Sequence, residues 1–361
     1  MLAENSTLVD FDPARFVVNC RGRVLDCRPH QEIGAHVMGV LNVTPDSFAD
    51  GGMYVAADAA VMHAEEMIGE GATIIDVGGE SSRPAGTVYG GGASTVPAAE
   101  EIRRVLPVIE TLAARFPDIL ISVDTYKPEV ALAALEAGAH IINDVTGLRY
   151  TTETAAVAAE YGAALVVMHS LGKPGDPSLS RDYADVVAEV RDSLEESVGR
   201  ALASGVSHVI VDPGFGFGKS VAENLLLLRD VESFLGLNRP VLIGVSRKST
   251  IGAVLGRPGE PLPPEARLYG SLGAAAVAVL RGASIIRAHD IRPTVEMLRT
   301  VGAILNVKVP GSRITASVAG SACPCHVPGS LGSPMDATTG PEKPGTWNRE
   351  PGTGKRERSE R

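Results

Sequence analysis

The sequence predicts an α/β protein, namely a (β/α)8 TIM barrel with an N-terminal β-hairpin cap and a disordered C-terminal tail. Short apolar, β-branched runs alternate with longer helix-period runs over residues 35–307. These runs are apolar on both faces, as the strands of buried parallel sheets are. Eight strand–helix units in roughly 270 residues match the count and size of this barrel. A doubly wound open sheet is the alternative.

The elements are expected in the following order. Residues 1–34 include the segment VVNCRGRVLDC, a candidate hairpin that turns at Arg21 and Gly22 and would close the bottom of the barrel. The strands are expected in HVMGVLNV, TIIDVGG, ILISVDT, HIINDV, ALVVMH, HVIVDPG, PVLIGVS and SIIRAHD. Helices are expected between them, for example over 56–70, 98–115, 128–137 and 183–204. Residues 308–361 are rich in Pro, Gly, Ser and Thr without an apolar period, which predicts disorder.

Composition excludes several classes of protein. The net charge of -10 argues against a general nucleic-acid binder, because a phosphate backbone requires a basic surface. No run approaches the ~20 apolar residues of a membrane helix, so no membrane partner is expected. The start of the chain is too polar for a signal peptide. The 4 cysteines do not form a disulfide framework in so long a chain, which predicts a cytoplasmic protein with reduced thiols.

All the expected strands end in polar residues. In chain order these are Asn42, Asp76, Asp124, Asn143 with Asp144, His169, Asp212, Ser246 to Ser249, and Arg287 with His289 and Asp290. A strand-end carboxylate often caps a helix, and this structural role is at least as good an interpretation for Asp76, Asp144 and Asp290. His169 is interpreted as a core histidine. Because all these ends meet at one edge of a parallel barrel, and buried polar groups need partners, a ligand site is predicted there.

The residue types indicate the ligand. Asp124, Asn143 and Asp212 offer acceptors and one amide, which suit a flat heterocycle with a guanidine-like edge of N–H donors. The cationic groups suited to an anion are Arg83, Arg247, Arg287 and His289, and Lys248 suits either ligand. Phe48 and Phe217 could stack on a ring. The segment DPGFGFGKS is similar to a phosphate-binding loop, but Pro213 stands where that loop has its first glycine.

Taken together, the segments resemble those of the dihydropteroate synthase family. The resemblance covers roughly residues 17–305 and rests on MGVLNVTPDSFADGG, DVGGESSRP, SVDTYKPEVA, INDVTGL, VMH, DPGFGFGK, GVSRKS and IIRAHD, in that order. It implies a TIM-barrel transferase of folate biosynthesis that is a target of sulfonamides. Such an enzyme joins hydroxymethyl-dihydropterin pyrophosphate to p-aminobenzoate and releases pyrophosphate and dihydropteroate.

The resemblance also implies roles for individual residues. Asp124, Asn143, Met168, Asp212 and Lys248 would bind the pterin. Asn42, Arg287 and His289 would bind the pyrophosphate, with Mg²⁺ shared at Asn42. The p-aminobenzoate site would be formed by Phe48, Ser82, Arg83, Pro84, Phe217, Ser246 and Arg247. Catalysis would fall to Asp124, Lys248, Arg287 and His289, and residues 270–282 would supply a homodimer face.

The sequence departs from the family pattern mainly in the second loop. Ser82 stands where the family has Thr, and the loop after Glu80 is longer than usual. We expect this loop to affect sulfonamide sensitivity more than catalysis. Two other functions compete with the synthase. A methyltetrahydrofolate-binding methyltransferase domain is disfavoured by SRKS together with GGESSRP. A silent pterin-binding homologue is disfavoured because every matched pterin and pyrophosphate residue is present.

Overall fold

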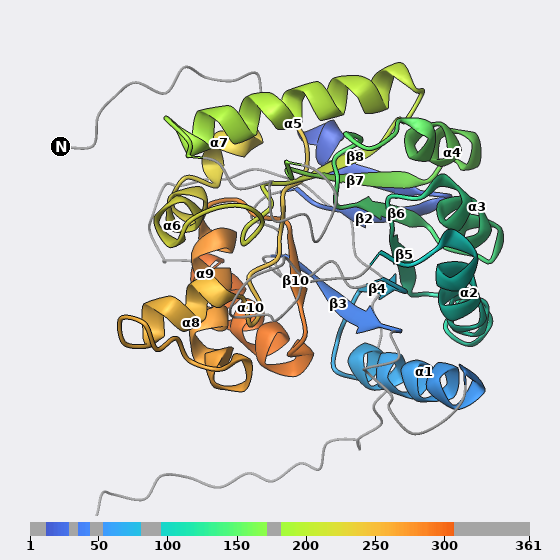
Figure 1. Ribbon diagram of the computed structural model, residues 1–361, viewed down its shortest axis with the longest axis horizontal. Coiled ribbons are helices and arrows are strands. Elements are labelled where there is room, and N and C mark those ends of the chain that lie inside the picture. The colour runs from blue at the N-terminus through green and yellow to red at the C-terminus, as the bar shows by residue number, and fades with distance from the viewer. Residues whose placement is uncertain (1–11, 29–34, 44–52, 81–94, 172–181, 307–361) are drawn as a thin grey trace, which may run out of the picture. The chain divides into compact units, whose positions relative to one another are not determined.

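The computed structural model describes residues 12–28, 35–43, 53–80, 95–171 and 182–306, and its centre is a barrel of parallel strands (Figure 1). Within these residues the strands are β3 (His36–Asn42), β4 (Ile74–Gly78), β5 (Leu120–Asp124), β6 (Ile141–Asp144), β7 (Ala164–Met168), β8 (Val209–Asp212), β9 (Leu242–Ile243) and β10 (Ile285–Ala288). Their order around the sheet is β8-β7-β6-β5-β4-β3-β10-β9. A bridge between Val211 and Val241 joins β8 to the segment before β9 and closes the ring.

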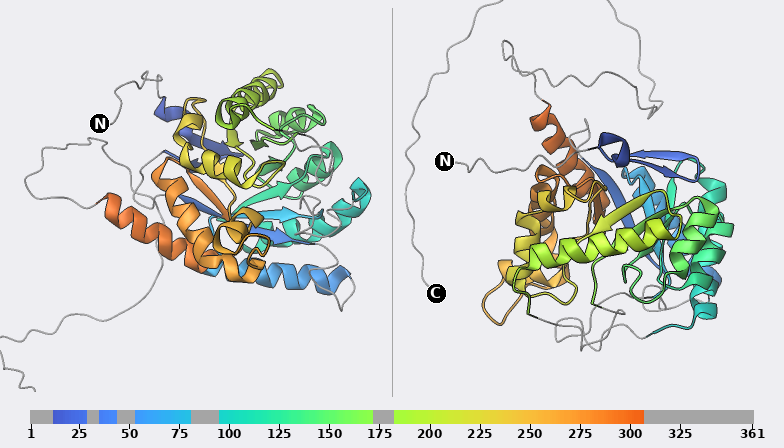
Figure 2. Two further views of the ribbon diagram at one scale, coloured as in Figure 1. Left: turned by 60° about the vertical axis from the view of Figure 1, so that its left-hand side comes forward. Right: turned by 90° about the horizontal axis from the view of Figure 1, so that it is seen from above.

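Helices surround the strands, as the views in Figures 1 and 2 show. They are α1 (Met53–Gly69), α2 (Ala98–Arg115), α3 (Pro128–Glu136), α4 (Glu153–Tyr161), α5 (Val186–Ala203), α6 (Val221–Arg229), α7 (Glu232–Leu235), α8 (Ser249–Leu255), α9 (Leu268–Leu280) and α10 (Ile291–Leu305). Local chemistry sets several ends. Ser220 and Glu223 form a capping box that starts α6, and Gly162 ends α4 in the left-handed conformation.

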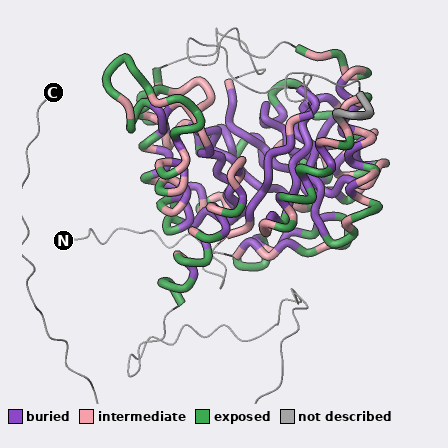
Figure 3. The backbone as a smooth tube through the Cα atoms, turned by 90° about the horizontal axis from the view of Figure 1, so that it is seen from below, coloured by how far each residue is buried: buried purple, intermediate pink, exposed green. Residues whose placement is uncertain are grey.

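The hairpin closes the end of the barrel where the strands begin. It consists of β1 (Val17–Cys20) and β2 (Arg23–Asp26), joined at Arg21 and Gly22, which both have positive φ. Its buried side chains Val18 and Leu25 share one apolar cluster with Met38, Ile74 and other residues near the strand starts. A larger cluster lies between the strands and the helices. Buried positions therefore follow the strands, while exposed positions lie on the outer helices (Figure 3).

The predicted fold is confirmed, because the described residues form a parallel eight-stranded barrel with an N-terminal hairpin. Helix α2 has the predicted bounds, and α1 begins three residues earlier than expected. The run PVLIGVS yields only the two residues of β9 as strand. The expected tail, residues 308–361, lies outside the described residues, and the division into a barrel of 35–307 with flanking segments stays a prediction.

Candidate active site

The floor of the candidate site is a network of three acidic or amide side chains around Arg287. Arg287 Nε donates to Asp76 Oδ2 at 2.7 Å, and Arg287 Nη2 donates to Asp124 Oδ2 at 3.0 Å. Asn143 Nδ2 donates to the same oxygen of Asp76 at 3.0 Å. The four residues come from β4, β5, β6 and β10. Because parallel strands bring their carboxyl ends to one edge, residues 211 positions apart in the chain meet here.

Burial sets the protonation chemistry of this floor. It raises the pKa of Asp124 to about 8, although the nearby Arg287 guanidinium opposes the shift. Burial alone would lower the pKa of Arg287, but Asp76 and Asp124 outweigh it, and the pKa is raised. Arg287 is therefore a permanent cation held between carboxyl groups. Asp76 has an exposure of 0%, and its Oδ1 has no hydrogen-bond partner in the described part of the chain.

A second group of charges lies beside this floor, at the ends of β8 and β9. Asp212 is buried, accepts a hydrogen bond from Gly214 N at 2.7 Å, and has a pKa raised by burial. Lys248 Nζ donates to the carbonyl oxygen of Phe215. Burial lowers the pKa of Lys248 to about 8, with Asp212 opposing this shift. An acceptor and a donor are thus available side by side for a polar ring.

Apolar groups complete the wall between these charges. Met168, Tyr126 and Val145 form a small buried cluster, and Phe217 packs against it. The centroid of the Phe217 ring lies 4.4 Å from Lys248 Nζ. The side chain expected to line the pterin pocket and a ring expected at the p-aminobenzoate site are therefore neighbours. Two substrates bound in these places would adjoin each other.

The residues that follow β9 contact those that follow β10 in two pairs, Ser246 with His289 and Arg247 with Asp290. Ser246 Oγ accepts a hydrogen bond from His289 N at 3.2 Å and lies 3.1 Å from its Nδ1. Arg247 makes two contacts to Asp290, of 2.9 Å from Nε and 2.5 Å from Nη2. Its φ of 57° is unusual for a residue other than glycine. The Arg247 guanidinium group is thus oriented by Asp290.

Asn42 ends β3 beside Gly78. A Cβ built on Gly78 would lie 3.8 Å from Asn42 Oδ1, an ordinary contact distance, so these two residues are neighbours at the ends of β3 and β4. Mg²⁺ typically takes one or two protein oxygens and completes its shell with water and phosphate. The amide oxygen fits that donor set. No group of three His, Cys, Asp or Glu side chains suited to a metal ion occurs in the described parts of the chain.

The structure brings together most residues of the predicted site. Asp124, Asn143, Met168, Asp212, Phe217, Lys248 and Arg287 lie in the contacts given above, and Ser246, Arg247 and His289 lie on the next loops. Phe48, Ser82, Arg83 and Pro84 lie outside the described residues. Their predicted roles remain predictions.

Two residues at the site were not assigned a role from the sequence. Asp76 joins Arg287 to Asn143, although a structural role was judged at least as good an interpretation for it. Lys219 lies in the glycine-rich loop and donates to Gly214 O at 2.9 Å. The signal for Asp76 was its place at the expected end of a strand, although β4 continues to Gly78. The signal for Lys219 was its place in DPGFGFGK, a segment that carries the family resemblance but in which no role was assigned to the lysine.

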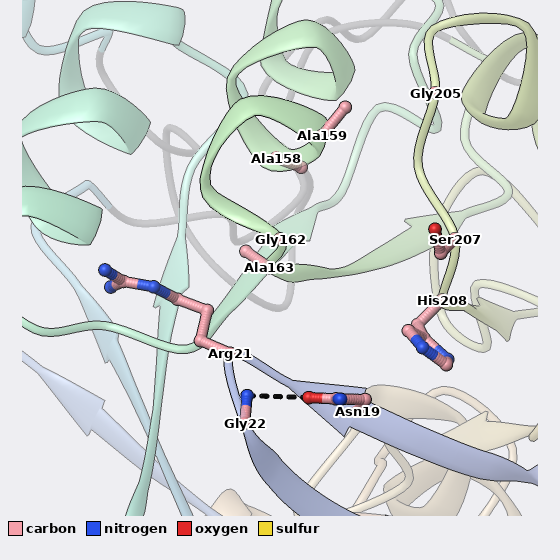
Figure 4. Close-up of a pocket in the computed structure, with 10 residues that line it drawn as sticks. All are labelled: Asn19, Arg21, Gly22, Ala158, Ala159, Gly162, Ala163, Gly205, Ser207 and His208. Atoms are coloured by element: carbon pink, nitrogen blue, oxygen red, sulfur yellow. Dashed lines mark hydrogen bonds between the residues drawn. The ribbon is translucent and has the colours of Figure 1, made fainter.

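A separate cavity of about 300 Å³ lies near the hairpin, at the opposite end of the strands (Figure 4). It is lined mainly by small residues of the hairpin turn and of the segments before β7 and β8, with Ser207 and His208. The Arg21 guanidinium group donates to the carbonyls of Leu135 and Ala139 instead. This cavity therefore lies away from the Arg287 network at the carboxyl ends of the strands. None of the helices in the described ranges has the length and apolar run that crossing a membrane requires.

A barrel with acceptors, an amide, a lysine and an arginine near its strand ends is suited to bind a polar heterocycle. The comparisons agree. A family model described as "Pterin binding enzyme" matches residues 38–289. The dihydropteroate synthase of Escherichia coli K12 is 46% identical over 275 residues, which are 76% of this chain and 93% of that protein.

Solved structures give the same result. The dihydropteroate synthase of Xanthomonas albilineans with 4-aminobenzoic acid is 42% identical, with a TM-score of 0.71, and the match covers 81% of this chain and 99% of that one. The Yersinia pestis enzyme with a sulfonamide drug is 40% identical, with a TM-score of 0.70 and coverage of 80% and 98%. This chain therefore belongs to the dihydropteroate synthases, a family of pterin-binding transferases.

Proposed function

We propose that this protein condenses hydroxymethyl-dihydropterin pyrophosphate with p-aminobenzoate, releases pyrophosphate and forms dihydropteroate in folate biosynthesis. The observation that carries the proposal is the network of Asp76, Asp124, Asn143 and Arg287 beside Asp212 and Lys248. It offers acceptors for the N–H groups of a pterin and a lysine donor for its ring acceptors. The relatives named above bind p-aminobenzoate or a sulfonamide in the same fold.

The proposed chemistry depends on a good leaving group more than on an activated nucleophile. An aromatic amine is already a modest nucleophile. As pyrophosphate departs, positive charge develops at the pterin methylene, and the carboxyl groups of Asp124 and Asp212 would favour that charge in their ionised forms, which for Asp124, with its pKa of about 8, are more populated as the pH rises. Arg287 and His289 would stabilise the departing anion. No covalent intermediate on the protein is expected, because pyrophosphate is already a good leaving group, and the Ser246 Oγ that lies 3.1 Å from His289 Nδ1 also accepts a hydrogen bond from His289 N.

We assign Mg²⁺ to Asn42 as part of this proposal. Asn42 would share the ion with the pyrophosphate oxygens, and the ion would supply charge neutralisation to the leaving group. The p-aminobenzoate would lie between Phe217, Ser246 and Arg247. Phe48, Ser82, Arg83 and Pro84 are proposed to complete that site.

A cytoplasmic location and a homodimer complete the proposal. Cys20 and Cys27 are buried free thiols, which suits a reducing compartment. On α9 the residues Tyr269, Gly273 and Val277 recur every four positions and are all exposed. An exposed apolar stripe of this kind suits a second copy of the chain.

The test is release of pyrophosphate by the purified protein with Mg²⁺ and both substrates. We expect release that requires p-aminobenzoate, with dihydropteroate as the second product and inhibition by a sulfonamide. Arg287→Ala should remove turnover without unfolding the barrel. Tight binding of the pterin pyrophosphate without any turnover would contradict the synthase and favour a silent pterin binder.

A further inference from the structure

The glycine-rich segment of residues 213–219 wraps around Lys248. Phe215 O accepts a hydrogen bond from Lys248 Nζ, and the Phe217 ring lies 4.4 Å from the same nitrogen. A Cβ on Gly216 would come within 2.8 Å of Lys248 Cδ. The backbone therefore approaches the lysine as closely as a residue without a side chain allows. The position of this segment determines the position of the Lys248 amine.

Two side chains hold the segment in this shape. Asn224 of α6 accepts from Gly216 N at 2.6 Å and donates to Lys219 O at 3.1 Å. Lys219 turns its own side chain back over the loop, where Nζ donates to Gly214 O at 2.9 Å and to Phe217 O at 3.1 Å. The ammonium group thus links the first and last turns of the loop across Phe215.

The surroundings of Lys219 also connect it to the site. Burial lowers its pKa to about 7, the Asp212 carboxylate opposes that shift, and Lys248 adds to it. Lys219, Lys248 and Asp212 therefore interact electrostatically. A lysine that served only the start of α6 would not need this position, because Ser220 and Glu223 already cap that helix.

We propose that Lys219 is a positioning residue for the condensation, whose side-chain nitrogen donates to both Gly214 O and Phe217 O and so holds the Phe217 ring and the Phe215 carbonyl against Lys248. The proposal rests on the proposed function for its kinetic consequence. Phe217 is the residue held directly, and it belongs to the proposed p-aminobenzoate site. The second substrate should therefore be affected more than the pterin.

The first experiment compares Lys219→Met with the wild type in steady-state kinetics. Methionine keeps much of the length and loses the charge and both donors. We expect the KM for p-aminobenzoate to rise about tenfold, while kcat and the Kd of the pterin pyrophosphate change less than about threefold. Lys219→Arg retains donors and charge, and it should recover most of the loss.

Ser220→Ala is the matched control. It removes the cap of α6 next to Lys219 but leaves the two loop carbonyls bonded. It should lower the melting temperature and leave both KM values unchanged. Equal KM values for Lys219→Met and the wild type would overturn the proposal and leave Lys219 a purely structural residue. If Lys219→Met does not fold, Lys219→Gln, which keeps a shorter donor, should show the same selective rise.

Hydrogen exchange of peptides covering residues 213–219 provides a readout that does not require turnover. Lys219→Met should exchange faster at Gly216 and Phe217 than the wild type or Ser220→Ala. Unchanged exchange would overturn the holding role even if activity fell. Failure of the wild type to turn over would refute the proposed function alone, since this exchange experiment would still decide what Lys219 holds.

Discussion

Asp76 illustrates how one carboxylate can organise a site. Its Oδ2 accepts hydrogen bonds from Arg287 and from Asn143, two groups with different proposed ligands. Charge-assisted hydrogen bonds of this kind fix an arginine fork strongly. The proposed pterin and pyrophosphate subsites would therefore be coupled through a residue that is itself fully buried.

We predict that Asp76→Asn lowers kcat/KM by roughly 10- to 100-fold, because Arg287 loses one ionic partner and Asn143 can rotate. Steady-state kinetics with each substrate varied in turn would measure this. Asp230→Asn is the control, since Asp230 pairs with Arg229 at the surface. Equal kcat/KM values for Asp76→Asn and Asp230→Asn would show that Asp76 does not orient the site.

Lys248 should make pterin binding depend on pH. Its pKa is lowered to about 8 by burial, so the amine is mostly charged at pH 7 and mostly neutral at pH 9. A neutral amine is a weaker donor to the pterin. If only the charged form binds well, the affinity for the pterin pyrophosphate should fall about tenfold between these pH values.

Calorimetry without p-aminobenzoate would measure this dependence. Lys248→Arg keeps its charge over the whole range, so its affinity should lose the part of the pH dependence that Lys248 causes and keep only the part due to the ligand and to Asp124, whose pKa is also about 8. The two curves must therefore diverge above pH 8. Parallel curves would assign the pH dependence to the ligand or to another residue.

At the scale of elements, a buried ionic cluster joins β4, α2 and the segment before α3. Lys127 Nζ contacts Glu80 Oε2 and donates to Glu101 Oε2 at 2.5 Å and to Val96 O at 2.6 Å. Glu101 has an exposure of 1%. Burial raises the pKa of Glu101, against the opposing effect of Lys127. Removing the cation would leave two buried carboxyl groups without their counter-charge.

We predict that Lys127→Met lowers the free energy of unfolding by about 3–5 kcal/mol. Urea denaturation followed by circular dichroism would measure it. Glu101→Gln combined with Lys127→Met should recover part of the loss. Arg281→Met is the control, because its partner Glu232 is exposed and such pairs contribute under about 1 kcal/mol. A loss as small as that of Arg281→Met would contradict the prediction.

Strand positions were predictable from the sequence because a strand buried on both faces is a continuous apolar run. Such runs mark β3 and β7 clearly. The end of β9 was not predictable, because its pairing is limited by neighbours distant in sequence. The site was predicted where a polar residue ends a strand, as at Asp124 and Asp212. The predicted site was incomplete for residues such as Asp76, whose role arises from contacts across the barrel.

Lys219 shows that limit most clearly. Its role depends on the path of its own loop, which carries Gly214, Gly216 and Gly218, all at positive φ. A Cβ on Gly214 would come within 2.0 Å of His169 O. The sequence shows that glycines are present, but only the folded loop shows which carbonyl each turn presents to the lysine.

At the scale of the whole molecule, the two ends of the barrel have different tasks. The hairpin end buries apolar groups against the strand starts, and the opposite end holds the network of Arg287 with Asp76 and Asp124. On the outer surface, helix α9 carries several exposed apolar side chains. There Tyr269 is 84% exposed, Val277 43% and Leu280 50%. These residues lie on one face, since helical neighbours recur at three and four positions.

The stripe on α9 can be tested as a dimer interface. A two-fold axis would bring the same patch of both copies together, so a new carboxylate on it would face its own equivalent. A stable interface buries about 800 Å² on each partner, and the exposed Val254 and Leu255 of α8 would extend this one. We predict that Val277→Glu converts a dimer into a monomer and leaves the barrel folded.

Sedimentation equilibrium over a range of protein concentrations would measure the mass. Met62→Glu is the matched control, because Met62 is 65% exposed but lies on α1, on another side of the barrel. The wild type and Met62→Glu should share the dimer mass, and their melting temperature should rise with concentration. Val277→Glu should lose both properties.

A Val277→Glu protein with the mass of the wild type would exclude α9 as the interface. A wild type that is monomeric at all concentrations would exclude the dimer itself. The exposed apolar area of α9 would then be too small to offset the free-energy cost of association.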